Sequence, residues 1–377
     1  MKITLDTATL SRELFKLQGI VSSRSTLQIL QNALLEARED GTLSLHATDL
    51  DISVSTTVPC DVEVPGRVTL KAKDLHDAVK NLRSDRVSLE KEDNLWVQLK
   101  AGTVRARFVG MDPDEFPQIQ SADDASFVAL RTVRLLRMIE RTIFSVSTDE
   151  ARPNLSGALM QLGEDGGLMM VSTDGHRLSK ARTNVSFEPG AAPDVLSDGI
   201  IVPRKGLAEL RRTLDVTEET VDFGIIGSSA VFRYGHTTLL VRLIDGTFPN
   251  FAQVIPAEQD DRKASIDRAE FISRLNFVSL FASSRTGNVR LQLEDDTCTI
   301  SAQDPDKGEC EERVPIGYDG PSVRAGFNYR YLLDVLKVVD GDHVSIEVID
   351  TLSPTILREL EGDDGDEALF IVMPMRL

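Results

Sequence analysis

Apolar residues recur every three or four positions at the start of each of three stretches of the chain, as in Leu10, Leu14 and Leu17. This spacing is typical of an amphipathic helix that buries one face. A second, shorter window with helical spacing follows in each stretch. The six predicted helices lie within 7–24, 71–86, 131–147, 204–215, 266–285 and 328–340.

Alternating apolar and polar residues predict strands after the long helices, for example at 43–47, 168–172 and 298–302. Polar turns such as 91–94 favour hairpins, in which neighbouring strands are antiparallel. Each stretch has the same order of elements: a strand, a long helix, strands, a shorter helix and closing strands. We therefore expect an α+β fold with antiparallel sheets and two helices in each of three repeated domains.

Two short sequence features repeat in step with these elements. A β-prone segment ending in a polar turn recurs around Asp49, Asp174 and Asp304, at intervals of 125 and 130 residues. A second series recurs at intervals of 132 and 125 residues, in Phe116-Pro117, Phe248-Pro249 and Met373-Pro374. Two unrelated markers with nearly one period predict an internal repeat. The predicted domains are 1–122, 127–256 and 257–377, each of ordinary domain size.

Composition narrows the class of protein. The 377 residues are 41% hydrophobic, which is enough for packed cores. The N-terminus lacks the apolar run of a signal peptide, and no stretch reaches the roughly 20 apolar residues of a membrane helix. Cys60, Cys298 and Cys310 are widely spaced, which argues against a disulfide framework and a cysteine-rich zinc site. We expect a soluble cytoplasmic protein without a cofactor or a metal.

The net charge of −18 argues against a nucleic-acid partner, but the charge is unevenly distributed. The six helix windows hold 21 of the 42 lysines and arginines and only 11 of the 60 acidic residues. A single basic helix is usually a solvated face. Six of them in an acidic chain instead favour one positive surface that binds the duplex backbone without reading sequence. Candidate contacts in these windows are Arg134, Arg137, Arg141, Arg204, Lys205, Arg211 and Arg212.

Two pairs of titratable residues raise a chemical alternative. Asp174 with His176 could act as an acid–base pair, and Asp49 with Asp51 could be a metal pair. The alternative function is a metal-dependent DNA hydrolase that uses the repeated aspartates. No nucleophile elbow, HExxH, phosphate loop or EF-hand spacing accompanies them. Aspartate readily binds nearby backbone amides in turns, and the aspartate recurs in all three stretches whereas the histidine does not. We favour turn residues and a protein that is not an enzyme.

Seven segments resemble those of the bacterial β sliding clamps, the processivity subunits of replicative DNA polymerases. They are 24–35, 41–52, 172–179, 201–210, 243–251, 326–336 and 372–377, which include STDGHRLS, LIDGTFPNF and the terminal VMPMRL. The resemblance covers the whole chain. It implies a head-to-tail homodimeric ring, with sheets outside and helices facing a central hole. Such a ring encircles double-stranded DNA and tethers the polymerase, the clamp loader and other clamp-binding proteins through short linear peptides.

The resemblance also implies roles for particular residues. For duplex contact, Arg24 and Lys73 match basic family positions, whereas Asp149, Pro153 and Asn154 depart from the family. At the ring seam, an edge strand at 103–108 would meet one near 297–302. The implied seam residues are Arg105, Arg107, Leu280, Phe281, Glu309, Glu311 and Glu312.

The implied pocket for partner peptides lies between the second and third domains. Its residues are Leu155, Thr173, Gly175, His176, Arg177, Leu178, Pro249, Val254, Asn328, Tyr331, Leu352, Ile371, Val372, Met373, Pro374, Met375, Arg376 and Leu377. Methionine and small apolar side chains suit a site with several partners because they adapt their shape. Gln253, Thr286 and Pro354 replace a basic, an aromatic and a serine residue of the family. Peptide preference is therefore expected to differ in detail.

Overall fold

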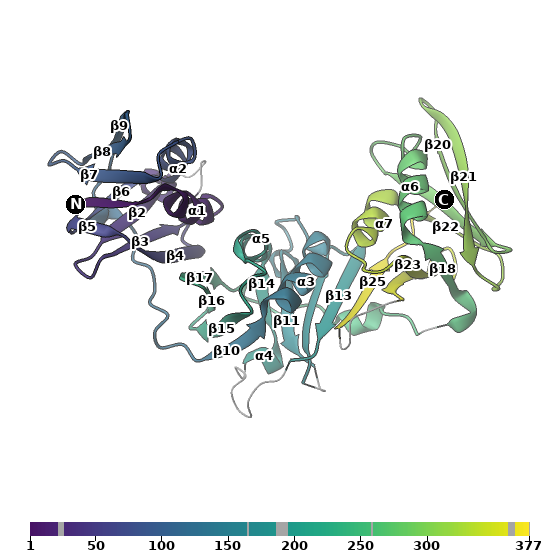
Figure 1. Ribbon diagram of the computed structural model, residues 1–377. Helices are drawn as coiled ribbons and strands as arrows, with labels where there is room; N and C mark the ends of the chain where they lie inside the picture. The colour runs from purple at the N-terminus through teal and green to yellow at the C-terminus, as the bar shows by residue number, and fades with distance from the viewer. Residues whose placement is uncertain (22–25, 164–165, 186–194, 258, 361–365, 377) are drawn as a thin grey trace. The chain divides into compact units, whose positions relative to one another are not determined.

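A computed structural model describes residues 1–21, 26–163, 166–185, 195–257, 259–360 and 366–376 (Figure 1). These residues form two compact units. The first combines 1–133 with 205–243, and the second combines most of 134–204 with 244–377. The central stretch contributes to both units, so the predicted boundaries of three domains stay a prediction. None of the helices in the described ranges is long and apolar enough to cross a membrane.

The first unit contains two antiparallel sheets. In sheet order, the five-stranded sheet is β5 (Asp61–Val64), β1 (Lys2–Asp6), β7 (Arg86–Lys91), β8 (Trp96–Ala101) and β9 (Val104–Val109). The eight-stranded sheet is β10 (Phe127–Arg131), β15 (Thr220–Ile226), β16 (Ser229–Tyr234), β17 (Thr237–Arg242), β4 (Ile52–Pro59), β3 (Thr42–Thr48), β2 (Asn32–Ala37) and β6 (Gly66–Lys71). The helices are α1 (Thr7–Gln18), α2 (Ala72–Lys80) and nearly all of α5 (Arg204–Thr213).

Strands β4 and β17 join distant parts of the sequence into one sheet, pairing from Thr56↔Thr237 to Ile52↔Val241. Buried polar contacts hold helix α1 against the paired strands β4 and β17. Glu13 accepts hydrogen bonds from Lys16 and Thr56, each at 2.7 Å, and Lys16 also donates to Thr237 at 2.9 Å. Burial opposes the charge on Glu13, but these hydrogen bonds outweigh it and lower the pKa of the carboxyl group.

The second unit is built on one twelve-stranded sheet. In order, it is β14 (Ile200–Pro203), β11 (Gly157–Leu162), β12 (Leu168–Thr173), β13 (Arg177–Thr183), β25 (Asp366–Val372), β24 (Thr355–Glu359), β23 (His343–Glu347), β18 (Lys263–Asp267), β21 (Gly308–Gly317), β20 (Thr297–Asp304), β19 (Asn288–Glu294) and β22 (Val323–Asn328). Its helices are α4 (Val195–Asp198), α6 (Arg268–Ser279), α7 (Tyr329–Leu336) and most of α3 (Thr132–Thr142). A buried apolar cluster that includes Phe271, Phe327 and Phe370 packs α6 and α7 against strands of the 263–372 part of the unit.

The predicted α+β class and all six predicted helices are confirmed, although each helix is shorter than its window. Local capping explains where three of them begin. The side chains of Asp6, Asp267 and Asn328 accept backbone N–H groups from the first turns of α1, α6 and α7. The four-residue helix α4 was not predicted, because it is too short for helical spacing to be recognised.

Candidate functional site

The turn at 173–177 connects β12 to β13 and is held by its own side chains. Thr173 Oγ1 accepts the N–H of Gly175 at 3.1 Å and donates to the carbonyl of Arg177 at 2.6 Å. Asp174 Oδ1 accepts the N–H groups of His176 and Arg177 at 2.9 and 3.1 Å. Gly175 has a φ of +89°, a left-handed conformation that glycine adopts at little cost.

The same turn occurs once more, in the first unit. Asp49 Oδ1 accepts the N–H groups of Asp51 and Ile52 at 3.1 and 2.7 Å, and Thr48 Oγ1 accepts that of Leu50. Asp304 likewise accepts a backbone N–H, from Asp306 at 3.0 Å. All three repeated aspartates therefore bind nearby amides, as the turn interpretation predicts. Within the described ranges, no three His, Cys, Asp or Glu side chains group as a metal site would.

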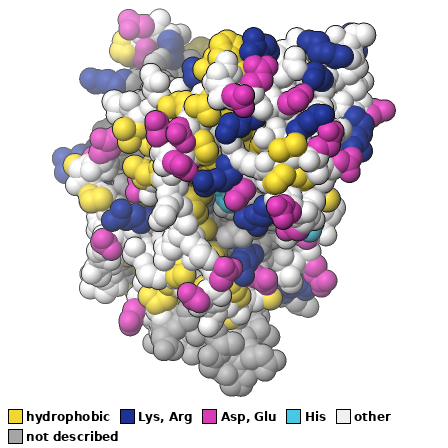
Figure 2. All heavy atoms as spheres, turned by 90° about the vertical axis from the view of Figure 1, so that its left-hand side faces the viewer, with side chains coloured by type: hydrophobic (Ala, Val, Ile, Leu, Met, Phe, Trp, Pro, Cys, Tyr) yellow, Lys and Arg dark blue, Asp and Glu magenta, His cyan; other side chains and the backbone are white. Residues whose placement is uncertain are grey.

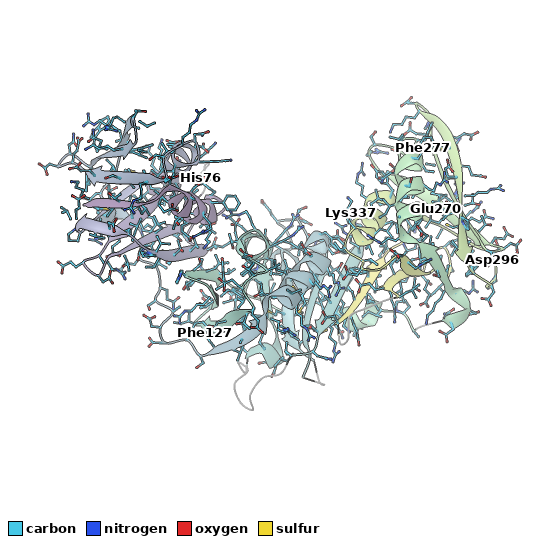
Figure 3. All side chains as sticks on the ribbon, in the orientation of Figure 1. His76, Phe127, Glu270, Phe277, Asp296 and Lys337 are labelled. Atoms are coloured by element: carbon cyan, nitrogen blue, oxygen red, sulfur yellow. The ribbon has the colours of Figure 1, made fainter. Side chains whose placement is uncertain are left out.

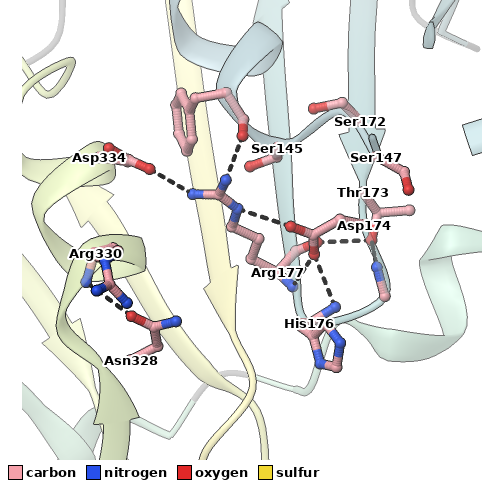
Figure 4. A network of polar contacts seen from close by, with 12 residues as sticks. Ser145, Ser147, Ser172, Thr173, Asp174, His176, Arg177, Asn328, Arg330 and Asp334 are labelled. Atoms are coloured by element: carbon pink, nitrogen blue, oxygen red, sulfur yellow. Dashed lines mark hydrogen bonds and ion pairs between the residues drawn. The ribbon is translucent and has the colours of Figure 1, made fainter. Parts of the chain in front are cut away.

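Arg177 links this turn to the rest of the second unit (Figure 4). Its Nε donates to Asp174 Oδ2 at 3.0 Å, its Nη1 to Asp334 Oδ2 at 2.7 Å, and its Nη2 to the carbonyl of Phe144. The guanidinium carbon also lies 4.4 Å from the centre of the Tyr331 ring, a cation–π distance. Burial raises the pKa of the Tyr331 hydroxyl, which favours its uncharged form.

An apolar floor lies beside the turn. Leu155, Leu178 and Ile371 belong to one buried cluster, together with Phe248. The C-terminal segment is held along it, because the N–H of Met373 donates to the carbonyl of His176 at 2.9 Å. Two residues later, the N–H of Met375 donates to Gly326 at 2.8 Å. The arrangement is an apolar patch with a polar rim, which suits binding rather than catalysis.

The structure thus brings ten of the predicted pocket residues into one network or cluster. They are Leu155, Thr173, Gly175, His176, Arg177, Leu178, Tyr331, Ile371, Met373 and Met375. Val254 and Leu352 are exposed, Asn328 caps α7, and Leu377 lies outside the described residues. Of the three family departures, Gln253 is exposed and Thr286 and Pro354 are half-buried.

Sequence reasoning missed Phe144 and Asp334, which both contact Arg177. Asp334 had a detectable signal, because it follows Tyr331 by three positions on a predicted helix and so shares its face. Phe144 contributes its backbone carbonyl and its ring, which lies 5.3 Å from the guanidinium, and no motif in the sequence indicates either contact.

The basic helix residues differ in how far they can reach a ligand. Lys73, Arg204, Lys205 and Arg211 are exposed, although Lys205 pairs with Asp49. Arg134 and Arg137 are half-buried and lie 3.8 Å from Asp366. Arg24 lies outside the described residues.

Two of the predicted DNA contacts need correction. Arg141 is only 3% exposed and binds Glu359 and Asp340, so it cannot contact a DNA backbone in this conformation. Arg212 is directed into the first unit, where its guanidinium donates to the carbonyls of Phe15 and Lys16 at the end of α1. Each of these two arginines makes structural contacts within its own unit.

The charged residues of the predicted seam lie on two strands, one in each unit. Strand β9 ends its sheet and carries Arg105 and Arg107; Arg107 pairs with Glu92 and stacks on Trp96. Hydrophobic side chains are exposed among basic and acidic ones on this side of the molecule (Figure 2). The predicted second edge at 297–302 is wrong, because β20 is paired on both sides, with β19 and β21.

The acidic seam residues lie instead on β21, whose first part is an exposed edge although the strand is internal in the sheet. Within the described strands its residues 308–315 pair only with β20, and this segment carries Glu309, Glu311 and Glu312. Glu309 and Glu311 share one face, whereas Glu312 lies on the other and pairs with Arg274 of α6 at 3.3 Å. At the end of α6, Leu280 is 64% exposed, and the ring centres of Phe277 and Phe281 lie 6.3 Å apart. Figure 3 labels Phe277 on this helix. Phe277 was not predicted, although it precedes Leu280 by one helical turn.

Family models match nearly the whole chain. The N-terminal, central and C-terminal domains of the DNA polymerase III beta subunit match residues 1–120, 129–250 and 252–376. The chain is 33% identical to a beta sliding clamp of Caulobacter vibrioides over 383 residues and 32% identical to that of Pseudomonas aeruginosa over 380, with complete coverage of both.

Solved structures agree with the sequence matches. The Bartonella birtlesii sliding clamp, solved bound to griselimycin, is 28% identical with a TM-score of 0.92, and each chain is covered completely. The sliding clamp of Bacillus subtilis is 27% identical with a TM-score of 0.91, covering 100% of this chain and 99% of that one. The present chain belongs to the β sliding clamps of bacterial DNA polymerase III.

Proposed function

We propose that this DNA sliding clamp closes head to tail into a homodimeric ring around duplex DNA and binds its partners at the 173–177 turn. Its family serves the replicative polymerase as a processivity factor and is not enzymatic. The observation that carries the proposal is the pair of complementary strand edges: β9 carries arginines, and 308–315 of β21 carries glutamates. We place the three clamp domains at 1–122, 127–256 and 257–377.

Pairing of strand edges between two protomers would explain how the ring closes. Unpaired strand edges invite pairing with another chain, so a protomer with a basic edge on β9 and an acidic edge on β21 can bind two neighbours in the same orientation. Such a head-to-tail interface closes into a ring when the rotation between copies allows it. Opposite charges favour the pairing of β9 with β21 over β9 with β9. The exposed apolar group at the end of α6 adds apolar area to this contact.

DNA binding is proposed to be electrostatic. The exposed cations Lys73, Arg204, Lys205 and Arg211 would contact phosphates without reading bases, while the acidic remainder repels DNA elsewhere. Arg134 and Arg137 would contribute only where a phosphate displaces their carboxylate neighbours. A protein with this partner is expected in the cytoplasm.

The partner site is proposed to take a short apolar peptide from the polymerase, the clamp loader or other clamp-binding proteins. Leu155, Leu178 and Ile371 offer an apolar floor, and exposed Met373 stands at its rim. Griselimycin, which the Bartonella birtlesii clamp binds, is proposed to bind at the same place in this chain. A bound partner gains effective concentration on the DNA, because it rebinds its primer before it diffuses away.

Retention on DNA tests the ring. The protein is loaded by its clamp loader onto a nicked circular plasmid, and half of the sample is then linearised at one site. We expect stable retention on the circle and rapid loss from the linear form. Leu280→Glu, which places a charge in the apolar part of the proposed seam, should be lost from both. Equal retention of the wild-type protein on both forms would falsify encirclement.

A further inference from the structure

The guanidinium of Arg177 is already occupied. Each of its three nitrogens donates to an acceptor within the second unit, and the side chain is only 12% exposed. The rings of Tyr331 and Phe144 lie against it at 4.4 and 5.3 Å. A peptide could replace these partners only by separating Arg177 from the largely buried Asp174 or from Asp334, which would keep the longer 3.8 Å pair with Lys337. Breaking an ion pair at a largely buried site is costly. Arg177 is therefore poorly suited to contact a peptide directly.

The contacts of Arg177 instead form a continuous chain from α7 to the wall of the pocket. Asp334 on α7 binds Arg177, Arg177 binds Asp174 Oδ2, and Asp174 Oδ1 accepts the N–H of His176 (Figure 4). The carbonyl of His176 in turn accepts the N–H of Met373. These contacts thus link the position of His176 and Met373, beside the apolar floor, to the carboxylate of Asp334 on α7.

The turn in the first unit shows that the chain of contacts is not needed to make a turn. Thr48, Asp49 and Leu50 form the same hydrogen bonds, and Leu50 has a φ of +82° against +89° for Gly175. Ile52 occupies the place of Arg177 there, and the carboxylate of Asp49 pairs instead with Lys205 of α5. The two copies of the turn are thus held by different cations, and only the copy at 173–177 is linked through an arginine to a carboxylate on α7.

We infer that Asp334 is a positioning residue for partner binding, acting through Arg177 to hold the 173–177 turn in its binding conformation. The inference rests on the proposed function, because the ligand is the one assigned to that pocket. A residue that supports a binding group in this way changes affinity without touching the ligand.

Calorimetric titration with griselimycin tests this role in the full-length protein. Asp334→Asn should weaken binding about tenfold, since a charge-assisted hydrogen bond is lost. The matched control Asp342→Asn makes the same change at an exposed carboxylate beyond α7 and should bind like the wild type. Asp334→Glu, which restores the charge, should recover part of the affinity. In the unbound protein, the backbone amide resonance of His176 should shift in Asp334→Asn and not in Asp342→Asn.

A double-mutant cycle distinguishes an indirect role of Asp334 through Arg177 from a direct contact of either residue with the ligand. Arg177→Ala, Asp334→Ala and the double variant should all lose affinity equally, because each breaks the same chain. Additive losses, or wild-type affinity in Asp334→Asn, would overturn the inference while leaving the pocket intact. If the wild-type protein itself does not bind griselimycin, the pocket assignment and this inference fall together.

Discussion

The Nη2 atom of Arg141 lies 2.8 Å from a carboxylate oxygen of Glu359, which is 218 positions away in sequence. The same atom lies 2.9 Å from Asp340. Arg141 and Glu359 are 3% and 4% exposed, so this ion pair is withdrawn from water. It fastens helix α3 to strand β24 inside the second unit, beside the ladder that joins β13 to β25.

Removing Arg141 should destabilise the second unit strongly. Arg141→Met leaves Glu359 buried without its partner, a change that typically costs about 3–5 kcal/mol. Urea unfolding followed by circular dichroism measures the loss. The control Arg152→Met breaks an exposed pair with Asp149 and should cost less than about 1 kcal/mol. Adding Glu359→Gln to Arg141→Met should recover stability; a double variant no better than the single one contradicts this account.

The Arg141 pair shows where sequence reasoning stops. Counting charges in helix windows placed Arg141 on a DNA-facing surface, because the count ignores which side of the helix meets the rest of the fold. Its partners are nearly 200 positions or more away, and no local pattern indicates them. Lys73 and Arg204 are exposed among the described residues, in agreement with the window count.

Features that depend only on neighbouring positions in the sequence were predictable, because their partners lie within the same local pattern. Helical spacing located all six longer helices. Asp49 and Asp174 behave as turn residues because the backbone N–H groups that donate to their carboxylates lie within three positions. Strand neighbours were not predictable. Alternation identifies β20 as a strand but cannot say that β19 and β21 flank it, so the wrong edge was assigned to the seam.

Exposed helix cations should set the salt dependence of DNA binding. Lys73→Ala and Arg204→Ala should each weaken duplex binding and lower the slope of log affinity against log salt by about 0.9. Fluorescence anisotropy over a range of salt concentrations measures both quantities. Arg38→Ala, which removes an exposed arginine from a hairpin instead of a helix, should leave the slope unchanged. The idea of a positive helix surface fails if all three variants have the same slope as the wild type.

Charge reversal should break and then restore the ring seam. Arg105→Glu places like charges on the two proposed edges and should weaken dimerisation by roughly tenfold or more. Glu311→Arg in the same chain reverses both edges and should restore association. Analytical ultracentrifugation over a concentration series reports the dimer constant, with Arg38→Glu as the matched charge reversal outside the edges. Failure of the double variant to regain dimer argues against pairing between β9 and β21.

Acid should weaken the start of helix α1. The backbone N–H of Thr9 donates to Asp6 at 2.7 Å, and this bond holds the pKa of Asp6 below its usual value. A carboxyl group whose pKa is lower when folded stabilises the protein above its unfolded pKa, and that contribution is lost as pH falls through the folded pKa. Asp6→Asn keeps a capping side chain but cannot titrate. Its melting temperature should therefore fall less than that of the wild type between pH 5 and pH 2; parallel curves would show that Asp6 contributes nothing.

The pairing of β4 with β17 should keep the first unit assembled even when the peptide that leads to β10 is cut. Asp123 and Asp124 are exposed in the segment that leads from the first repeat to β10, whereas the ladder and the buried Glu13 group hold the two sides together. A protease cut between these two aspartates would give fragments that stay associated on a sizing column and separate only in denaturant. The chain should equally tolerate being expressed as two polypeptides that assemble with each other.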